Sequence, residues 1–211
     1  LREGQHNLTF RAIRGANVSE KNISFFIDSI DPQIITTKPA NRDFTNGSDF
    51  YVTYTENNLK ETTLFYGEDK ITNNDCPSGR SQICNFNINL TKYNGDVITY
   101  NFELRDIANN SDRSRNISVN VDTIPPNITK FNLTIIGKYA FFNISINESN
   151  FDKVQYKDFK DVSPSWKTLC SSLKNGICYK KLFFRTGQHN VTVQVLDKAR
   201  NYLEINKEFA V

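Results

Sequence analysis

The sequence predicts an all-β chain made of tandem β-sandwich domains, and three observations support this fold class. Apolar and polar residues alternate over short runs, as in Arg115–Val121, Phe142–Ile146 and His189–Val195, and a period of two is typical of half-buried antiparallel strands. Blocks of sequence recur at fixed offsets, which indicates tandem repeats. Asn-Gly pairs punctuate the runs as turns, and no segment has a convincing helical period.

The recurring blocks divide the chain into parts. Gly4–Asn7 recurs as Gly187–Asn190 at an offset of 183 residues, and Asp28–Ile34 matches Asp122–Ile128 at an offset of 94. We therefore expect the two C-terminal strands of a truncated repeat in residues 1–28 and complete domains in residues 29–122 and 123–211. The chain contains no Met, so we expect it to be an excerpt from a longer protein.

Each complete repeat is expected to hold about seven short strands. In the first repeat the apolar runs lie near residues 33–37, 50–55, 62–66, 84–90, 97–105 and 115–121. Pro32 precedes the first run, Asn46-Gly47 precedes the second and Asn94-Gly95 precedes the fifth; Asn175-Gly176 marks a turn in the second repeat. A repeat of 94 residues with these strands has the size and pattern of an immunoglobulin-like sandwich.

Two Pro-containing segments read as short linkers between the repeats. The linker residues that we single out are Asp28, Pro32, Asp122, Pro125 and Pro126. Proline fixes its own φ and biases the preceding residue to extended conformations, so the joints should be stiff. The sequence therefore predicts sandwiches arranged as a rod.

A short pattern at the end of each repeat resembles a known group of domains. The pattern Asp-x-Ala-x-Asn occurs at Asp106, Ala108 and Asn110 and again at Asp197, Ala199 and Asn201. Together with the Asp-x-x-x-Pro-x-Ile linker, it resembles the tandem immunoglobulin-like repeats of bacterial and archaeal cell-surface proteins, such as surface-layer proteins, adhesins and surface filaments. The truncated repeat in residues 1–28 departs from the Asp-x-Ala-x-Asn pattern, because it has Arg14 and Val18 in place of the Asp and the Asn. The resemblance implies a cell-surface location.

Composition and histidine placement argue against several functions. The net charge is +3 without a dense basic block, so nucleic-acid binding has no electrostatic basis. No run approaches 18 apolar residues, so no membrane span is expected. The only histidines, His6 and His189, occupy the same position of two repeats. They cannot assemble one catalytic site, and we expect no enzyme and no catalytic residue.

Paired acidic residues are sparse. The pairs Asp28/Asp31 and Asp158/Asp161 are expected to be solvated. An alternative is that Asp28, Asp31 and Asp122, which lie near the linkers, bind Ca²⁺ between domains, because this hard cation takes several oxygen ligands. The low density of acids disfavours this alternative, and we expect no metal and no other cofactor.

The four cysteines form two matched pairs. Cys76 and Cys84 map onto Cys170 and Cys178, with seven residues between the members of each pair. Structural zinc pairs have two to four intervening residues, and no His lies nearby. We therefore predict the disulfides Cys76–Cys84 and Cys170–Cys178, which imply an oxidising compartment outside the cytoplasm.

Asparagine is in excess and is organised into N-x-S/T sequons. With 27 Asn and 32 Ser or Thr among 211 residues, chance gives about four sequons. Twelve Asn begin one: Asn7, Asn17, Asn22, Asn46, Asn89, Asn109, Asn116, Asn127, Asn132, Asn143, Asn147 and Asn190. Strand alternation alone raises this number, because Asn and Ser/Thr then share the outward face. We nevertheless predict N-linked glycans on several of these residues.

The leading hypothesis is a structural segment of an extracellular, N-glycosylated, multi-repeat protein of a surface layer, stalk or filament, with an archaeal source implied by the resemblance. Its partners would be neighbouring repeats and identical subunits of a filament or array. The alternative is an adhesin module that recognises a glycan or protein through the divergent segment Lys157–Cys178, which contains Trp166. A lone loop aromatic more often packs beneath its loop. A non-catalytic domain of an extracellular enzyme is a third possibility.

Overall fold

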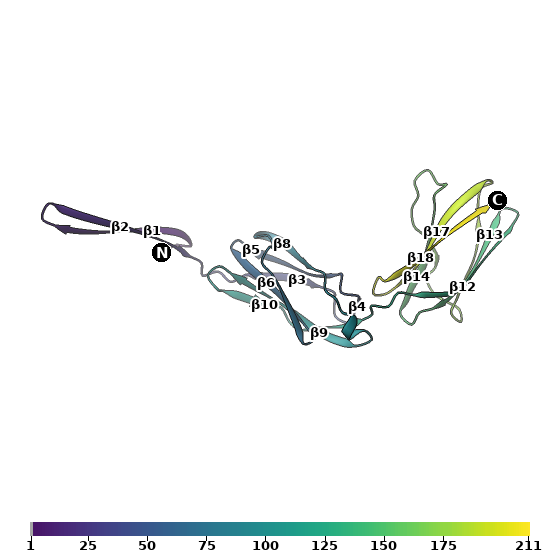
Figure 1. The fold of residues 1–211 in the computed structure, drawn as a ribbon, viewed down its shortest axis with the longest axis horizontal. Helices are drawn as coiled ribbons and strands as arrows, with labels where there is room; N and C mark the ends of the chain where they lie inside the picture. The colour runs from purple at the N-terminus through teal and green to yellow at the C-terminus, as the bar shows by residue number, and fades with distance from the viewer. Residues whose placement is uncertain (1) are drawn as a thin grey trace. The chain divides into compact units, whose positions relative to one another are not determined.

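The computed structural model describes residues 2–211 and consists almost entirely of β-strands (Figure 1). Within that range the single helical element is a 3-10 turn, Thr91–Tyr93. The described chain divides into two compact units: the first comprises the residues up to Lys38, residues 50–86 and residues 99–117, and the second comprises residues 39–49, 87–98 and 118–211. The predicted all-β class is confirmed.

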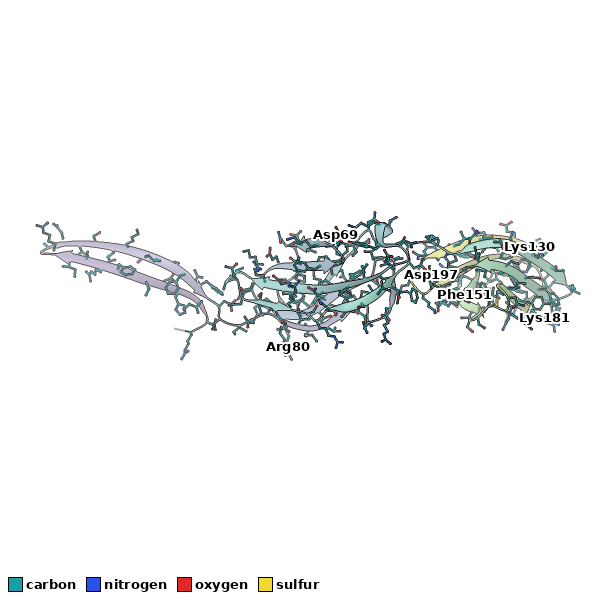
Figure 2. The ribbon with its side chains drawn as sticks, turned by 90° about the horizontal axis from the view of Figure 1, so that it is seen from below. Asp69, Arg80, Lys130, Phe151, Lys181 and Asp197 are labelled. Atoms are coloured by element: carbon teal, nitrogen blue, oxygen red, sulfur yellow. A yellow bond between two sulfur atoms is a disulfide. The ribbon has the colours of Figure 1, made fainter. Side chains whose placement is uncertain are left out.

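The first unit begins with a long two-stranded hairpin, drawn in purple in Figure 1. Strands β1 (Gly4–Arg14) and β2 (Asn17–Ile27) pair antiparallel without a bulge around a two-residue turn. Gly15 has a φ of +63°, a conformation that glycine adopts without the steric penalty of a Cβ. Side chains project from both faces of the ribbon (Figure 2).

The rest of the first unit consists of antiparallel strands. One sheet has the order β3-β5-β8, and the pairings of the other include β7 with β6, β6 with β9 and β10 with β9. The strands are β3 (Gln33–Lys38), β5 (Phe50–Glu56), β6 (Leu59–Tyr66), β7 (Asp69–Asn73), β8 (Gly79–Phe86), β9 (Val97–Asp106) and β10 (Ser111–Arg113). Alternate residues of β5 are buried, as its sequence period predicts. The fully buried side chains include Val52, Tyr54 and Phe102.

The second unit contains a short parallel pair and two antiparallel sheets. The parallel pair is β4 with β11, and the sheets have the orders β12-β13-β16 and β15-β14-β17-β18. The strands are β4 (Phe44–Thr45), β11 (Ile117–Val121), β12 (Asn127–Ile136), β13 (Tyr139–Asn147), β14 (Phe151–Asp158), β15 (Lys167–Cys170), β16 (Ile177–Phe183), β17 (Gln188–Asp197) and β18 (Tyr202–Ala210). The two sheets share one core, in which Phe142, Ile144, Val154 and Val193 are completely buried.

Both predicted disulfides are present. Cys76 is bonded to Cys84, and Cys170 to Cys178. Cys170 ends β15 and Cys178 lies in β16, so this disulfide joins the two sheets of the second unit. Cys76 lies in the connection between β7 and β8, and Cys84 lies in β8.

The predicted strand at residues 84–90 is displaced in the structure. Strand β8 covers Gly79–Phe86 instead. The side chain of Asn89 accepts hydrogen bonds from the Thr91 amide and hydroxyl, which turns the chain into the 3-10 turn. The apolar side chains of Ile88 and Leu90 are still buried. The alternating pattern therefore predicts correctly which residues are buried, although the segment is not a strand. The short strands β4, β7 and β10 were not predicted.

Candidate functional site

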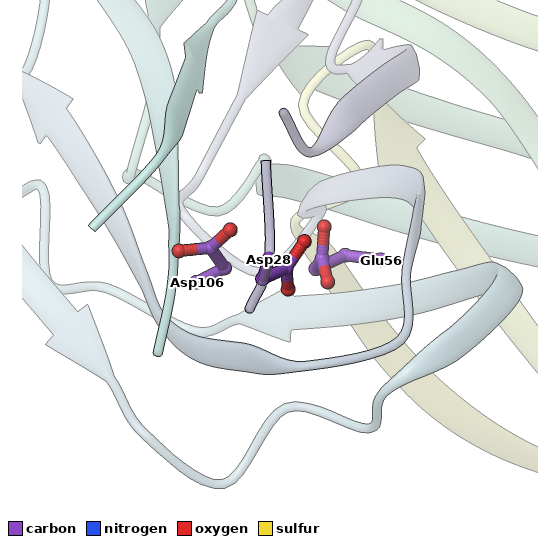
Figure 3. A group of neighbouring side chains, drawn as sticks. All are labelled: Asp28, Glu56 and Asp106. Carbon is purple, nitrogen blue, oxygen red and sulfur yellow. The ribbon is translucent and has the colours of Figure 1, made fainter. Parts of the chain in front are cut away.

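Three carboxylates converge where the first unit's strands end. Asp28 follows β2, Glu56 ends β5 and Asp106 ends β9, and Figure 3 shows their side chains next to one another. Each offers a carboxylate oxygen within 4.8 Å of the others. Glu56 and Asp106 are 5% and 0% exposed, and Asp28 is half-buried. Like charges this close in a poorly hydrated place repel one another strongly.

Two asparagines hold this cluster in place. Asn110 donates from its backbone to Asp106 Oδ1 at 2.8 Å and from its side chain to Asp106 Oδ2 at 2.7 Å and to the Asp28 carbonyl at 3.0 Å. Asn58 donates from its side chain to Asp28 Oδ2 at 2.9 Å and from its backbone to Glu56 Oε1 at 2.6 Å. The Asp-x-Ala-x-Asn pattern is therefore a local turn whose Asn also fixes the preceding linker.

The second unit contains the same hydrogen-bond network. Asn201 bonds Asp197 Oδ1 at 2.8 Å, Asp197 Oδ2 at 2.7 Å and the Asp122 carbonyl at 2.8 Å. Asn150 bonds Asp122 Oδ2 at 2.7 Å and Glu148 Oε1 at 2.6 Å. Asp122, Glu148 and Asp197 thus take the places of Asp28, Glu56 and Asp106.

One acid in each unit has a raised pKa, and burial is the main cause. Burial, reinforced by the charges of Asp122 and Glu148, raises the pKa of Asp197 to about 6, although two hydrogen bonds from Asn201 oppose the rise. Burial also raises the pKa of Glu56, with the charges of Asp28 and Asp106 acting in the same direction. Carboxylate oxygens are hard donors, the kind of ligand that a divalent cation such as Ca²⁺ takes.

The three acids considered as alternative Ca²⁺ ligands, Asp28, Asp31 and Asp122, do not come together in one group. Asp28 belongs to the carboxylate cluster of the first unit, Asp122 belongs to the matching hydrogen-bond network of the second unit, and Asp31 belongs to neither. The expectation that acids near the linkers are sparse is wrong, because Glu56 and Asp106 come from strand ends that the linear sequence places far away. A missed signal is Glu56-x-Asn58, which recurs as Glu148-x-Asn150.

The second acid pair also differs from expectation. Asp158 is 4% exposed rather than solvated, and its Oδ2 lies 2.6 Å from Nδ1 of the buried His189. The other ring nitrogen, Nε2, lies 2.7 Å from the carbonyl of Arg185. Asp161 pairs with Lys167 at 2.6 Å. His189 is thus a buried structural residue, and His6 makes the matching contact with the Arg2 carbonyl at 2.6 Å.

The remaining linker residues differ in exposure. Pro32 and Pro126 are buried, whereas Pro125 is exposed. The sequon asparagines are all exposed except Asn46 and Asn143, which are half-buried. The side-chain amide of Asn46 donates to Asn201 Oδ1 at 3.1 Å, and Asn143 lies inside the central strand β13. These two sequons are the least accessible.

Trp166 lies in the divergent connection between β14 and β15. Its side chain remains 37% exposed, and Lys157 Nζ lies 4.5 Å from the ring centroid. Phe159 and Val162 in the same connection are more exposed still. This connection therefore presents an apolar surface beside a cation.

Comparisons with known proteins support the fold. No family model matches the sequence, and no curated protein matches it significantly. A solved structure of the chicken CNTN1 FN1–FN3 domains has a TM-score of 0.52 and 10% identity, covering 97% of this chain and 78% of that one. The fibronectin(III)-like modules of Clostridium thermocellum CbhA give a TM-score of 0.47 and 11% identity, covering 85% and 93%.

These matches extend to the fold and no further. The chain has tandem β-sandwiches with a fold similar to that of the CNTN1 domains, and the predicted β-sandwich fold class is confirmed. None of the described residues forms a helix that is long and apolar enough to cross a membrane.

Proposed function

We propose that this chain is a non-enzymatic structural segment of an extracellular, N-glycosylated cell-surface protein, in which a divalent cation stiffens each repeat where it joins its linker. The observation that carries the proposal is the carboxylate cluster of the first unit, whose residue types and Asn hydrogen bonds recur in the second unit. An ion there would tie the linker residues Asp28 and Asp122 to the ends of the neighbouring strands. Ca²⁺ is the expected ion.

The disulfides and the exposed sequons support an extracellular, N-glycosylated protein. Two disulfides favour an oxidising compartment, and ten exposed sequons offer sites for N-linked glycans. Within this proposal residues 1–28 close a preceding repeat, residues 29–122 and 123–211 are complete domains, and the repeats form a rod. Neighbouring repeats and identical subunits of a surface array are the partners, and the source is archaeal.

Calorimetric titration of the chelator-treated chain with Ca²⁺ tests the proposal. We expect two ions per chain, and one ion for Glu56→Gln or Glu148→Gln. Asp31→Asn is the matched control, because Asp31 is a linker acid outside both clusters, and it should still bind two. Absence of heat and of any rise in Tm with millimolar Ca²⁺ would refute the proposed cation role. Mass spectrometry of native material tests the glycans separately.

The exposed connection between β14 and β15 favours a second candidate function, adhesion to a glycan or protein. Phe159, Val162 and Trp166 present an apolar surface that the fold does not cover. Trp166→Ala should abolish cell binding while circular dichroism and Tm stay unchanged. Tyr202→Ala is the control, since Tyr202 is an aromatic on β18 that is more exposed than Trp166 and lies outside this connection. Unaltered binding by Trp166→Ala would exclude this surface.

A further inference from the structure

The hairpin β1–β2 has one apolar face that is exposed to solvent. Its strand register places His6, Leu8, Phe10 and Ala12 on one face together with Ile23 of the partner strand. Leu8, Phe10 and Ile23 are 44%, 56% and 43% exposed. The middle of the opposite face is polar and contains Asn7, Thr9, Asn22 and Ser24, and its apolar residues Phe26, Ile13 and Val18 lie towards the two ends of the hairpin. This asymmetry is typical of a sheet with one face packed against a core.

The same face occurs, fully covered, in the second unit. His6, Leu8, Phe10 and Ala12 correspond in sequence to residues of β17, which are His189, Val191, Val193 and Val195. Those four residues are 4%, 0%, 0% and 0% exposed. The strands β12, β13, β14 and β16 provide the residues that cover them.

The local geometry of the hairpin already matches that of the covered copy. His6 stacks on Phe25 with ring centroids 5.5 Å apart, and His189 stacks on Phe209 at 5.4 Å. His6 Nε2 lies 2.6 Å from the Arg2 carbonyl, as His189 Nε2 lies 2.7 Å from that of Arg185. The residues just before β1 therefore reproduce the connection from β16 to β17.

One contact of the covered copy is missing in the hairpin. His189 Nδ1 meets the carboxylate of Asp158, which ends β14. His6 Nδ1 has no such partner among residues 2–211, and β1 pairs only with β2 in the described chain. An acceptor must therefore supply an apolar core, an edge strand for β1 and an acid facing His6.

We propose that the His6 face of this hairpin docks onto an incomplete sandwich equivalent to β12–β16, joined directly ahead of Arg2, whose acid at the Asp158 position binds His6 Nδ1. The inference deepens the domain assignment made under the proposed function. The hydrogen bond between imidazole and carboxylate fixes the register, and apolar burial provides the stability. Cation binding at Glu56 and Glu148 does not depend on it, so the two proposals fail separately.

A chimera tests this docking with the chain's own acceptor strands. A copy of residues 123–184 takes the place of Leu1, so that Phe184 of the copy directly precedes Arg2 of the remaining chain. Amide exchange at Leu8 and Phe10 should slow by about 100-fold or more relative to the unextended chain, because protection follows the free energy of opening. In the control, the same copy of residues 123–184 is followed by its native residues 185–211. Protection of β17 and β18 in this control shows that the copied strands can bind a C-terminal hairpin.

Point variants of the chimera separate docking from nonspecific burial. Leu8→Asp should abolish the protection, and Thr9→Asp, on the opposite face, should retain it. Asp158→Asn in the added copy should weaken the protection and restore solvent exchange at His6 Nδ1. The proposal is overturned if the amides of β1 and β2 stay unprotected in the chimera while those of β17 and β18 are protected in the control. Concentration-dependent protection in the unextended chain also overturns it and would assign the face to a second copy.

Discussion

Burial dominates the chemistry of Asp197. Its side chain is 1% exposed, and its pKa is raised from 3.8 to about 6. Because the raised pKa belongs to the folded state, the stability from this group is complete below about pH 4 and is lost as the pH rises through 6. At neutral pH the ionised Asp197 lowers the free energy of unfolding, and a bound cation would offset this loss.

The variant Asp197→Asn isolates this effect in chelator-treated protein. Relative to the variant, the wild type should lose roughly 3 kcal/mol of unfolding free energy between about pH 4 and pH 7, since one pKa unit corresponds to about 1.4 kcal/mol. Urea unfolding at several pH values measures the difference. A difference that does not change with pH contradicts the assigned pKa. Excess Ca²⁺ should reduce the loss.

The core aromatic Phe142 permits a matched comparison with its neighbour on β13. Phe142 is completely buried and lies within 6.4 Å, between ring centroids, of Phe131, Tyr156 and Phe184. Phe142→Ala should lower the unfolding free energy by about 3–5 kcal/mol, because it leaves a cavity. The half-buried Phe141 points to the other side, and Phe141→Ala should cost about 1 kcal/mol. Equal losses would show that the burial is misassigned.

At the scale of elements, turns and cross-links determine where strands stop. Gly47 has a φ of +100°, and a Cβ there would lie 2.1 Å from the Ile88 carbonyl oxygen. Gly95 has a φ of +87° but has open space around it. The two turns therefore need glycine for different reasons.

Alanine substitutions separate these reasons. Gly95→Ala introduces backbone strain alone and should cost about 1 kcal/mol. Gly47→Ala adds a steric clash with backbone and should cost about 3 kcal/mol or more. Thermal unfolding of both variants, monitored by circular dichroism, gives the ranking. The reverse order would contradict the close approach of Gly47 to Ile88.

The disulfide between β15 and β16 closes a short ring. Replacing Cys170 and Cys178 together by Ser should lower the unfolding free energy by about 2.5 kcal/mol, the chain-entropy value for a ring of this size. Urea unfolding under non-reducing conditions measures it, and the double variant should no longer respond to dithiothreitol at this site. An unchanged midpoint would mean that the disulfide contributes nothing to stability.

Sequence periodicity anticipates the strands well and the carboxylate clusters poorly. Strands such as β5 and β13 alternate because one face is buried, and their sequences show this alternation. The carboxylates that lie next to Asp28 cannot be predicted from the sequence, because Glu56 and Asp106 approach it only through the folding of the sheets. Likewise, nothing local distinguishes the buried Asp158 from the exposed acids around it. Sites assembled from distant strand ends require the tertiary fold.

At the scale of the whole molecule, repetition applies to contacts as well as to sequence. Both Asp-x-Ala-x-Asn turns bond the carbonyl of the linker Asp that precedes their own domain. In the second unit the linker is held further by Thr123, which donates to Asn94 Oδ1 at 2.7 Å. Order in the linker thus depends on groups that are distant in sequence.

Limited proteolysis should report this dependence. Removal of Ca²⁺ by a chelator should accelerate cleavage within residues 123–125 by a nonspecific protease, because the repelling carboxylates loosen the linker. The Glu148→Gln variant should be cleaved at a rate that the chelator does not alter. Fragment masses identify the cut. Cleavage that is equally fast with and without Ca²⁺ in the wild type would argue against ion-dependent order.

The parallel pair β4–β11 has a mechanical consequence. Its backbone bonds join Arg42 to Ser118, Asp43 to Asn120 and Thr45 to Asp122, just before the chain leaves β11. Two parallel strands pulled by opposite ends of a chain slide along each other, so all of their hydrogen bonds are loaded together. An antiparallel edge pulled from one end opens bond by bond. A tensile force on this chain would therefore load all the hydrogen bonds of the β4–β11 pair in shear, the geometry that resists rupture best.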